Sequence, residues 1–194
     1  MARTMTDPRP LVDEPVSVDL LNTVWLDAAG EHDLLADTDG LRTWLSGQSL
    51  DGAPASEEAR LVLVAAREAL RRHVRGLLAP QSTPPSTPPS ASSSAEAELN
   101  DILAVGCFGR ALEDGAPVTR RVVDDPVRIA AWTAVEDYLQ LLERDPGRLR
   151  RCANPVCVLH FFDISKRGDR RWCSMAGCGN RAKAARHYAR RRQG

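Results

Sequence analysis

Aromatic residues are scarce in this sequence, and long apolar runs are absent. Phe, Trp and Tyr make up 5% of the 194 residues, and no run approaches the roughly 18 consecutive apolar residues that a membrane helix needs. Residues 1–15 hold acidic residues and prolines but no apolar segment, which is not the pattern of a secretory signal. The sequence therefore predicts a cytoplasmic protein without membrane contact. Its hydrophobic content of 43% predicts a folded core.

Lysine is nearly absent too, and the charges are separated along the chain. The formal net charge is zero. Residues 1–147, however, hold 13 arginines against 24 acidic residues, a net charge of −11, whereas residues 148–194 hold 13 basic residues against two acidic ones, a net charge of +11. This asymmetry indicates a C-terminal part that binds polyanions.

Helical periodicity predicts a mostly helical domain over residues 1–147. Residues 16–28 place apolar side chains on one helical face, and Gly30 is a plausible stop. A short helix is expected around Trp44, with Asp37 or Thr38 as its cap, and a long helix should begin after the cap residue Ser56. The apolar face of the long helix is predicted to comprise Leu61, Val64, Ala65, Leu70, Val74 and Leu77.

The second half of this domain contains a low-complexity stretch and a hairpin signal. Residues 80–94 are rich in proline and serine, a composition that cannot bury apolar area, and we expect a mobile loop followed by a short helix. Asp114-Gly115 between two β-prone runs predicts a hairpin. Asp125-Pro126 should open the last helix of the domain, with the proline in its first turn.

Only five cysteines occur, and four of them are clustered. Cys152-x4-Cys157 and Cys173-x4-Cys178 are separated by 15 residues. Clustered cysteines in a cytosolic chain indicate metal binding more often than disulfides, and two short loops can supply the four soft ligands of tetrahedral zinc. We therefore predict one structural zinc ion, with four buried thiols or two disulfides as the alternatives. Cys107 is expected to be a buried apolar thiol.

The residues around these cysteines predict a treble-clef-like finger. One strand is expected over residues 158–162, a turn near residues 166–169 and a returning strand over residues 170–172. A helical pattern follows Cys178. Knuckle, hairpin and then a helix with a ligand at its start is the treble-clef arrangement, and the helix N-terminus would stabilise thiolate charge.

A basic helix is predicted over residues 179–194. Ala182, Ala185 and Ala189 share one face, which we expect to lie against the metal hairpin. Arginine predominates over lysine, which suits bidentate contacts to phosphate or guanine. The side chains expected to contact nucleic acid are Arg170, Arg171, Asn180, Arg181, Lys183, Arg186, His187, Arg190 and Arg191.

Several of these motifs carry a family resemblance. Residues 152–157 (CANPVC) and 178–181 (CGNR) resemble the CGNR zinc-finger family. Residues 19–23 (DLLNT) and 41–45 (LRTWL) resemble the ABATE domain of stress-induced transcription regulators, which usually precedes that finger. The resemblance implies a DNA-binding finger whose four cysteines hold the metal, attached to a regulatory domain.

Together these observations predict a mainly α protein with a small hairpin, in which a helical ABATE-like domain (residues 1–147) is followed by a CGNR-type finger (residues 148–194). The predicted function is that of a DNA-binding transcription regulator without enzymatic activity. The helical domain would sense an effector or mediate homodimerisation. Asp19 and Asn22 are candidates for an effector pocket, with a buried hydrogen-bonded pair as the alternative reading.

Three other functions remain open from the sequence. The basic helix could bind an acidic protein partner or the acidic first domain of its own chain. Phosphate-binding arginines do not distinguish DNA from RNA. A treble-clef nuclease would use His160 as its base, although Asp163 alone is a poor ligand set for a second metal.

Overall fold

The computed structural model describes residues 7–48, 50, 52–79 and 90–191, and it shows helices accompanied by small antiparallel hairpins, as predicted. The helices are α1 (Val16–Leu21), α2 (Thr38–Gln48), α3 (Glu57–Leu77), α4 (Ser90–Leu103), α5 (Ile129–Arg144) and α6 (Asn180–Arg191). The paired strands are β1 (Val24–Asp27) with β2 (Gly30–Asp33), β3 (Gly106–Glu113) with β4 (Ala116–Val123), and β5 (Leu149–Arg151) with β6 (His160–Phe162). No helix in these ranges is long and apolar enough to cross a membrane.

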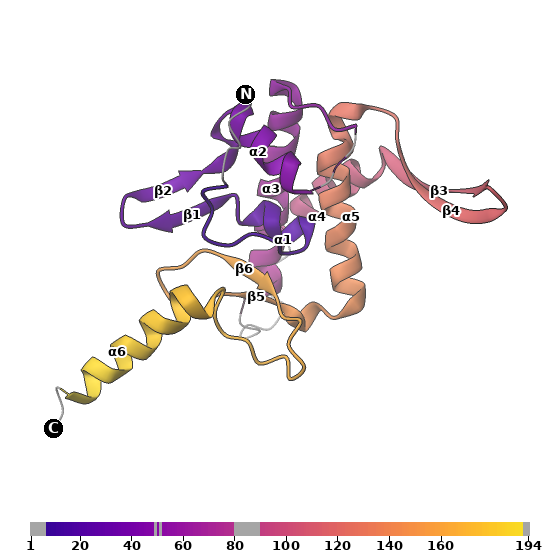
Figure 1. The fold of residues 1–194 in the computed structure, drawn as a ribbon. Helices are drawn as coiled ribbons and strands as arrows, with labels where there is room; N and C mark the ends of the chain where they lie inside the picture. Colours follow the sequence, from indigo (N-terminus) through magenta and orange to yellow (C-terminus); the bar gives the residue numbers. More distant parts are fainter. Residues whose placement is uncertain (1–6, 49, 51, 80–89, 192–194) are drawn as a thin grey trace.

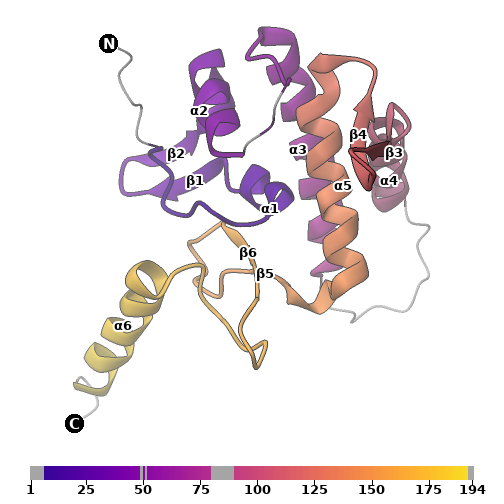
Figure 2. The same cartoon turned by 45° about the vertical axis from the view of Figure 1, so that its right-hand side comes forward.

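The two longest helices, α3 and α5, lie side by side at the centre of a helical body (Figure 1). α1 and α2 pack on one side of them, and α4 packs on the other (Figure 2). The largest fully buried side chains of this body include Trp44, Trp132, Tyr138, Leu20, Leu35, Leu41, Leu63 and Leu70. Burial of these apolar and aromatic groups is the main favourable term in its folding.

The buried side of α3 differs from the predicted one. Leu61 and Leu77, which were expected to face the core, are 54% and 38% exposed. The buried apolar residues of the helix are Ala59, Leu63, Ala66, Ala69, Leu70 and Val74. Arg67 also lies on the buried side, where its Nη1 and Nη2 bind the carboxylate of Asp33 at 2.6 and 2.8 Å. Leu70 and Val74 are buried as predicted, whereas the charged Arg67 interrupts the hydrophobic pattern of the core-facing side, so the pattern alone gave a face that is only partly correct.

The single helix predicted over residues 16–28 is wrong. α1 ends at Leu21, and the chain turns into β1, whose β-prone Val24 and Trp25 pair with β2. Gly30 does not stop a helix; it opens β2 with a φ of 126°, a conformation that glycine adopts without strain. The helix ends because Asn22 binds the main chain of β6, a contact across 138 residues that local periodicity cannot reveal.

The predicted helix caps are confirmed. The Ser56 hydroxyl accepts a hydrogen bond from the Ala59 N–H at 3.2 Å at the start of α3. Asp37 caps α2 by accepting from the Gly40 N–H at 2.8 Å, and Asp125 accepts from the Val127 N–H at 3.0 Å in the turn before α5. These side chains satisfy N–H groups that the first turn of a helix leaves without partners.

The loop predicted over residues 80–94 can be compared with the structure only from Ser90 onward. Residues 80–89 lie outside the described residues. α4 begins at Ser90, so the helix starts before the predicted loop end at residue 94.

The hairpin predicted around Asp114-Gly115 is present as β3 and β4. Both turn residues have positive φ, 48° and 79°, as a type I′ turn requires. The hairpin projects from the helical body (Figure 1), and Phe108 at its base packs edge-on against Trp132 of α5. Cys107 is exposed on β3, so the prediction of a buried thiol is wrong.

The hairpin of β5 and β6 is joined to the helical body through a continuous core. Leu149, Phe161 and Phe162 are buried in the same apolar cluster as the residues of α1, α3 and α5. Figure 2 shows β6 directly beside α1, near the end of α5. The metal-binding segment is therefore fixed to the helical body by packing as well as by the chain connection.

Polar contacts close the edge of β6 against the body. The Asn22 side chain donates to the His160 carbonyl and accepts from the His160 N–H, both at 2.9 Å. Glu14 accepts from the Phe162 N–H at 2.9 Å and pairs with Arg170 at 3.1 Å. The N–H and C=O of His160 and the N–H of Phe162 thereby find partners that a two-stranded sheet cannot provide by itself.

Replacing Asn22 with alanine tests this attachment. The variant leaves the N–H and the C=O of His160 without partners in a half-buried strand, and unsatisfied groups of this kind cost about 1–3 kcal/mol each. We expect Asn22→Ala to lower the free energy of unfolding by about 2–4 kcal/mol in urea titrations followed by circular dichroism. Asn100→Ala, at an exposed position of α4, is the control and should change stability by less than about 0.5 kcal/mol. Equal effects of the two substitutions would contradict the assignment.

Candidate zinc centre and nucleic-acid interface

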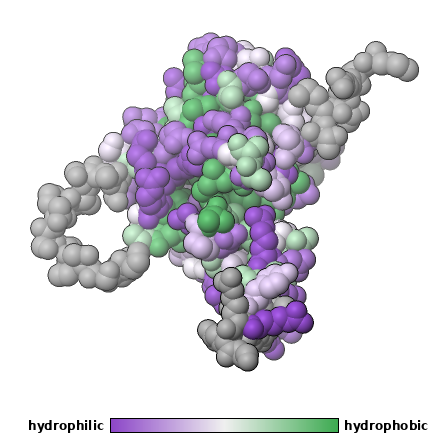
Figure 3. All heavy atoms as spheres, turned by 90° about the vertical axis from the view of Figure 1, so that its left-hand side faces the viewer, coloured by the Kyte–Doolittle hydropathy of each residue, from purple (hydrophilic) through white to green (hydrophobic). Residues whose placement is uncertain are grey.

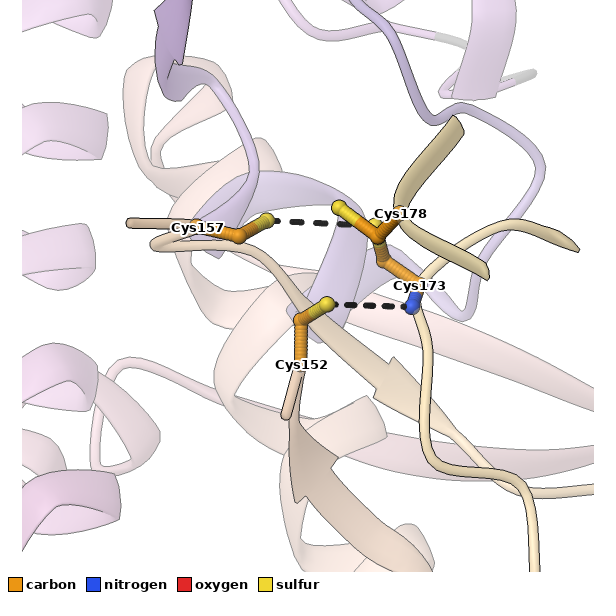
Figure 4. Close-up of side chains that lie close together, drawn as sticks. All are labelled: Cys152, Cys157, Cys173 and Cys178. Atoms are coloured by element: carbon orange, nitrogen blue, oxygen red, sulfur yellow. Dashed lines mark hydrogen bonds between the residues drawn. The ribbon is translucent and has the colours of Figure 1, made fainter. Parts of the chain in front are cut away.

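The four clustered cysteines lie close enough together to supply the ligands of one metal ion. Their sulfur atoms all lie within 4.8 Å of one another, and those of Cys157 and Cys173 are 3.8 Å apart. Sulfurs at the usual zinc distance of about 2.3 Å are separated by about 3.8 Å at the corners of a regular tetrahedron. Figure 4 shows the side chains converging from two separate loops. The site can hold one zinc ion with a closed shell, which makes the metal structural.

Hydrogen bonds to sulfur hold the two loops in this arrangement. The Cys173 N–H points at the sulfur of Cys152 at 3.4 Å, and the Asn154 amide donates to the sulfur of Cys178 at 3.3 Å. The first loop is itself a tight turn, closed by a 2.9 Å bond from the Cys157 N–H to the Asn154 carbonyl. Donors around thiolates offset part of their negative charge and orient them toward the metal.

The thiols of the site influence one another strongly. A hydrogen bond from the Cys173 thiol lowers the pKa of Cys157 to about 5, and the same interaction raises the pKa of Cys173. Burial raises the pKa of Cys152. Without a cation, neighbouring thiolates therefore repel one another and share protons. A divalent zinc ion removes this conflict because it binds all four as thiolates.

The predicted hairpin of the finger is partly wrong. β6 (His160–Phe162) falls within the predicted strand, but it pairs with β5, which precedes the first cysteine, and not with residues 170–172. The intervening loop is held by Asp163, whose two oxygens accept from the N–H groups of Ser165 and Arg170 at 2.9 and 2.8 Å. Because the N–H of Arg170 donates to Asp163, it is not available for strand pairing, and residues 170–172 do not pair with β6.

The basic helix α6 begins two residues after Cys178 and projects away from the rest of the molecule (Figures 1 and 2). Ala185, expected to lie against the finger, is exposed, so this docking prediction is wrong. α6 directly follows the turn Met175–Gly179, which contains the ligand Cys178. Only the first turn of the helix stays close to the finger. In Figure 3 the lower protrusion that includes α6 is largely hydrophilic, whereas apolar side chains gather on the body above it.

The described basic side chains of α6 point into solvent. Arg181, Lys183, Arg186 and Arg191 are exposed, and no ion pair joins them to an acidic residue of the described chain. Asn180, at the start of the helix, is exposed as well. The side chains of the other two predicted contact residues, His187 and Arg190, lie outside the described residues.

The two predicted contact residues ahead of α6 have different surroundings. Arg170 is occupied within the finger, since it pairs with Glu14 and its guanidinium lies 4.3 Å above the ring of Phe161. Arg171 is exposed and lies beside the ring of Trp172. It lines a hollow of about 630 Å³ together with Arg150 and Arg151.

The prediction from sequence missed Arg150 and Arg151 as candidate contacts. The signal was present as the run Arg148-Leu-Arg-Arg151 ahead of the first cysteine. Its position in a strand that pairs with β6 becomes evident only in the structure.

Asp19 and Asn22 both lie at buried positions that hold neighbouring segments together. Oδ1 of Asp19 accepts hydrogen bonds from Arg9 at 2.5 Å and from the Trp44 indole and the Gln48 amide at 2.9 Å each. Burial raises the pKa of Asp19, and the Arg9 guanidinium acts in the opposite direction. Its Oδ2 is buried without a partner in the described part of the chain. Asp19 thus binds Arg9 and α2, and Asn22 binds β6, so both side chains hold neighbouring segments, which is the role considered as the alternative to an effector pocket.

The nuclease hypothesis finds little support in the geometry. Within the described residues, the four cysteines form the only cluster of three or more side chains that could hold a metal. Asp163 uses both carboxylate oxygens inside its own loop. Burial, aided by the charges of Arg151 and Arg71, lowers the pKa of His160 to about 4. The described chain therefore offers no ligand set for a second, catalytic metal.

Comparison with protein families finds two matches in succession. Residues 14–145, more than half of the chain, match the ABATE family, whose description is "putative stress-induced transcription regulator". Residues 148–191 match the CGNR zinc finger. Neither description is that of an enzyme. A search of curated proteins found no match.

Removal of the metal should weaken the whole fold, because the finger shares its core with the helical body. We expect one zinc per purified chain by elemental analysis. A strong chelator should lower the free energy of unfolding by several kcal/mol.

Cys178→Ser should lose the metal and resemble the chelated protein. Cys107→Ser, on exposed β3, should keep both zinc and stability. Retention of one zinc by Cys178→Ser, or an unchanged melting temperature on chelation, would refute the assignment.

Proposed function

The chain belongs to the ABATE family of putative stress-induced transcription regulators and ends in a CGNR zinc finger, and from this premise we propose that it is a transcription regulator whose finger binds DNA. The observation that carries the proposal is α6, a basic helix that projects from the molecule with no acidic partner in the described chain. A zinc-anchored helix that presents arginines to solvent is a common way to enter the major groove.

Helix energetics support an external partner for α6. An isolated helix of 12 residues is marginal in water, and the described side chains of α6 are nearly all exposed, so packing contributes little to its stability. Arg186 and Lys183 also lie on the same side of the helix, where like charges repel. A polyanion converts this repulsion into attraction, and the release of its counterions adds to the affinity.

The dimensions of α6 suit a DNA groove. Its 12 residues span about 18 Å, and the major groove admits one α-helix. In the proposed complex, Asn180 and Arg181 in the first turn reach base edges, while Lys183, Arg186 and Arg191 contact phosphates. The remaining predicted residues, His187, Arg190, Arg170 and Arg171, belong to the same proposal, to which Arg150 and Arg151 are added.

The proposal assigns a division of roles along the chain. Residues 148–194 bind nucleic acid, and residues 1–147 sense an effector or form a homodimer. A single short helix binds DNA weakly, and pairing two copies raises the effective affinity without new contacts to the bases. RNA would satisfy the same arginines, so a matched RNA duplex belongs in the same test.

Fluorescence anisotropy of labelled duplex DNA with the zinc-loaded protein tests the proposal. We expect affinity to fall steeply with salt and binding to disappear after chelation. The triple variant Lys183→Gln/Arg186→Gln/Arg191→Gln keeps good helix formers and should reduce the log–log salt slope by about 2–3, at about 0.9 per lost phosphate contact.

The matched control removes three exposed arginines from the helical body, as Arg42→Gln/Arg120→Gln/Arg128→Gln. It should leave the salt slope unchanged. Equal losses in the two triple variants would show that binding follows net charge and not α6. Absence of binding at every salt concentration, to DNA and RNA alike, would overturn the proposal in favour of an acidic protein partner.

A further inference from the structure

A second group of basic side chains lies in a hollow between the end of α3 and the finger. The hollow measures about 480 Å³, and no residue of α6 lines it. Its lining comprises Arg71, Arg75, Leu78 and Ala79 from α3 and the residues after it, and Arg151, Val158 and His160 from the finger. The volume is within the range of about 300–1,000 Å³ that is usual for small-molecule sites.

The positive charge of this hollow is poorly compensated. Arg75 has no ion pair within the described chain, and Arg71 reaches only Glu68, at 3.5 Å. The Glu68 carboxylate lies closer to Arg67, at 3.1 Å. None of the lining residues is acidic, and residues 80–89, which follow Ala79, contain no Asp or Glu in the sequence. Of the three arginines that line the hollow, Arg75 and Arg151 therefore have no ion pair in the described chain, and Arg71 shares its one carboxylate with Arg67.

The histidine at the hollow adds a polar group without a partner. Nδ1 of His160 is buried and has no hydrogen-bond partner in the described residues. The positive charges of Arg71 and Arg151 reach this ring. Asn22 holds the main chain of His160, which is one of the residues that line the hollow. A buried nitrogen without a partner is costly unless a ligand or water satisfies it.

We propose that this hollow is an effector site for a small molecule that carries a phosphate or pyrophosphate group. Arg71 and Arg75 from α3 and Arg151 from β5 hold the anionic oxygens, as arginine forks do in phosphate sites. The hollow is larger than a phosphate group, and Leu78 and Val158 offer apolar contacts to an organic part of the ligand. The anion site stands on its own geometry, whereas the term effector rests on the proposed regulatory function.

An anion in this position would bridge the helical body and the finger. Arg75 belongs to α3, and Arg151 directly precedes the zinc ligand Cys152. A ligand that binds both strengthens the attachment of the finger to the body, and it stabilises the folded chain by mass action. It would thereby restrict the orientations available to α6 relative to a second copy of the protein.

Calorimetry and thermal melting with inorganic pyrophosphate at fixed ionic strength test the site in the zinc-loaded full chain. We expect saturable binding and a rise in melting temperature for the wild type. Arg75→Gln and Arg151→Gln should each weaken binding about tenfold, the effect of one lost charge-assisted contact. Arg72→Gln is the matched control, because Arg72 is the neighbour of Arg71 on α3 but pairs with Glu98 and does not line the hollow.

The outcomes separate the site from the proposed DNA-binding function, because pyrophosphate binding is measured without DNA. No binding by the wild type, or equal binding by Arg75→Gln and Arg72→Gln, would overturn the site. DNA affinity measured without pyrophosphate should stay within twofold in Arg75→Gln. A loss as large as that of the α6 triple variant would assign the hollow to the DNA backbone and overturn the small-molecule proposal. Urea unfolding confirms that each variant is folded.

Discussion

The hydrogen bonds of Asn22 to both main-chain groups of His160 are the contact on which the arrangement of the molecule depends. β6 is three residues long and has one strand beside it, so its other edge must be satisfied from outside the sheet. Asn22 and Glu14 do this from the helical body. The apolar side of the same strand then completes the body's core with Phe161 and Phe162. The zinc site is consequently attached to the helices by packing and hydrogen bonds as well as by the chain connection.

Opposite net charges do not bring α6 back onto its own body. The buried carboxylate of Asp19 already pairs with Arg9, and the partly exposed carboxylate of Asp33 pairs with Arg67. Many of the other acidic groups of the body are exposed, where attraction over more than about 10 Å is screened and surface ion pairs contribute little. The turn that contains the zinc ligand Cys178, meanwhile, sets the direction in which α6 leaves the finger. The arrangement in Figure 1 therefore leaves the positive charge available to an external polyanion.

The features that sequence predicted correctly are those that depend on local chemistry. Four cysteines at regular spacing, the cap residues Ser56 and Asp37, and the Asp114-Gly115 turn each act through neighbours in the chain or through strict geometry. The errors concern contacts between distant segments. The sequence pattern assigns Asn22 to an apolar helix, because its hydrogen-bond partner His160 lies 138 residues away and local periodicity does not reveal it. β5 is invisible as a strand because a three-residue strand rich in arginine has no hydrophobic pattern, and it forms by pairing with β6.

A structural zinc ion limits the ways in which a regulator of this design can respond to a signal. Four thiolates complete the coordination shell and leave no position for an effector at the metal. A ligand can shift a conformational equilibrium only if it binds the two states with different affinity, so it must act where the body and the finger meet. That boundary combines an apolar core, the Asn22 and Glu14 contacts, and the arginines of the hollow. The first two are satisfied within the protein. Arg75 and Arg151 have no ion pair in the described chain, and Arg71 shares Glu68 with Arg67. This is why the hollow is the part of the boundary at which a ligand has most to contribute.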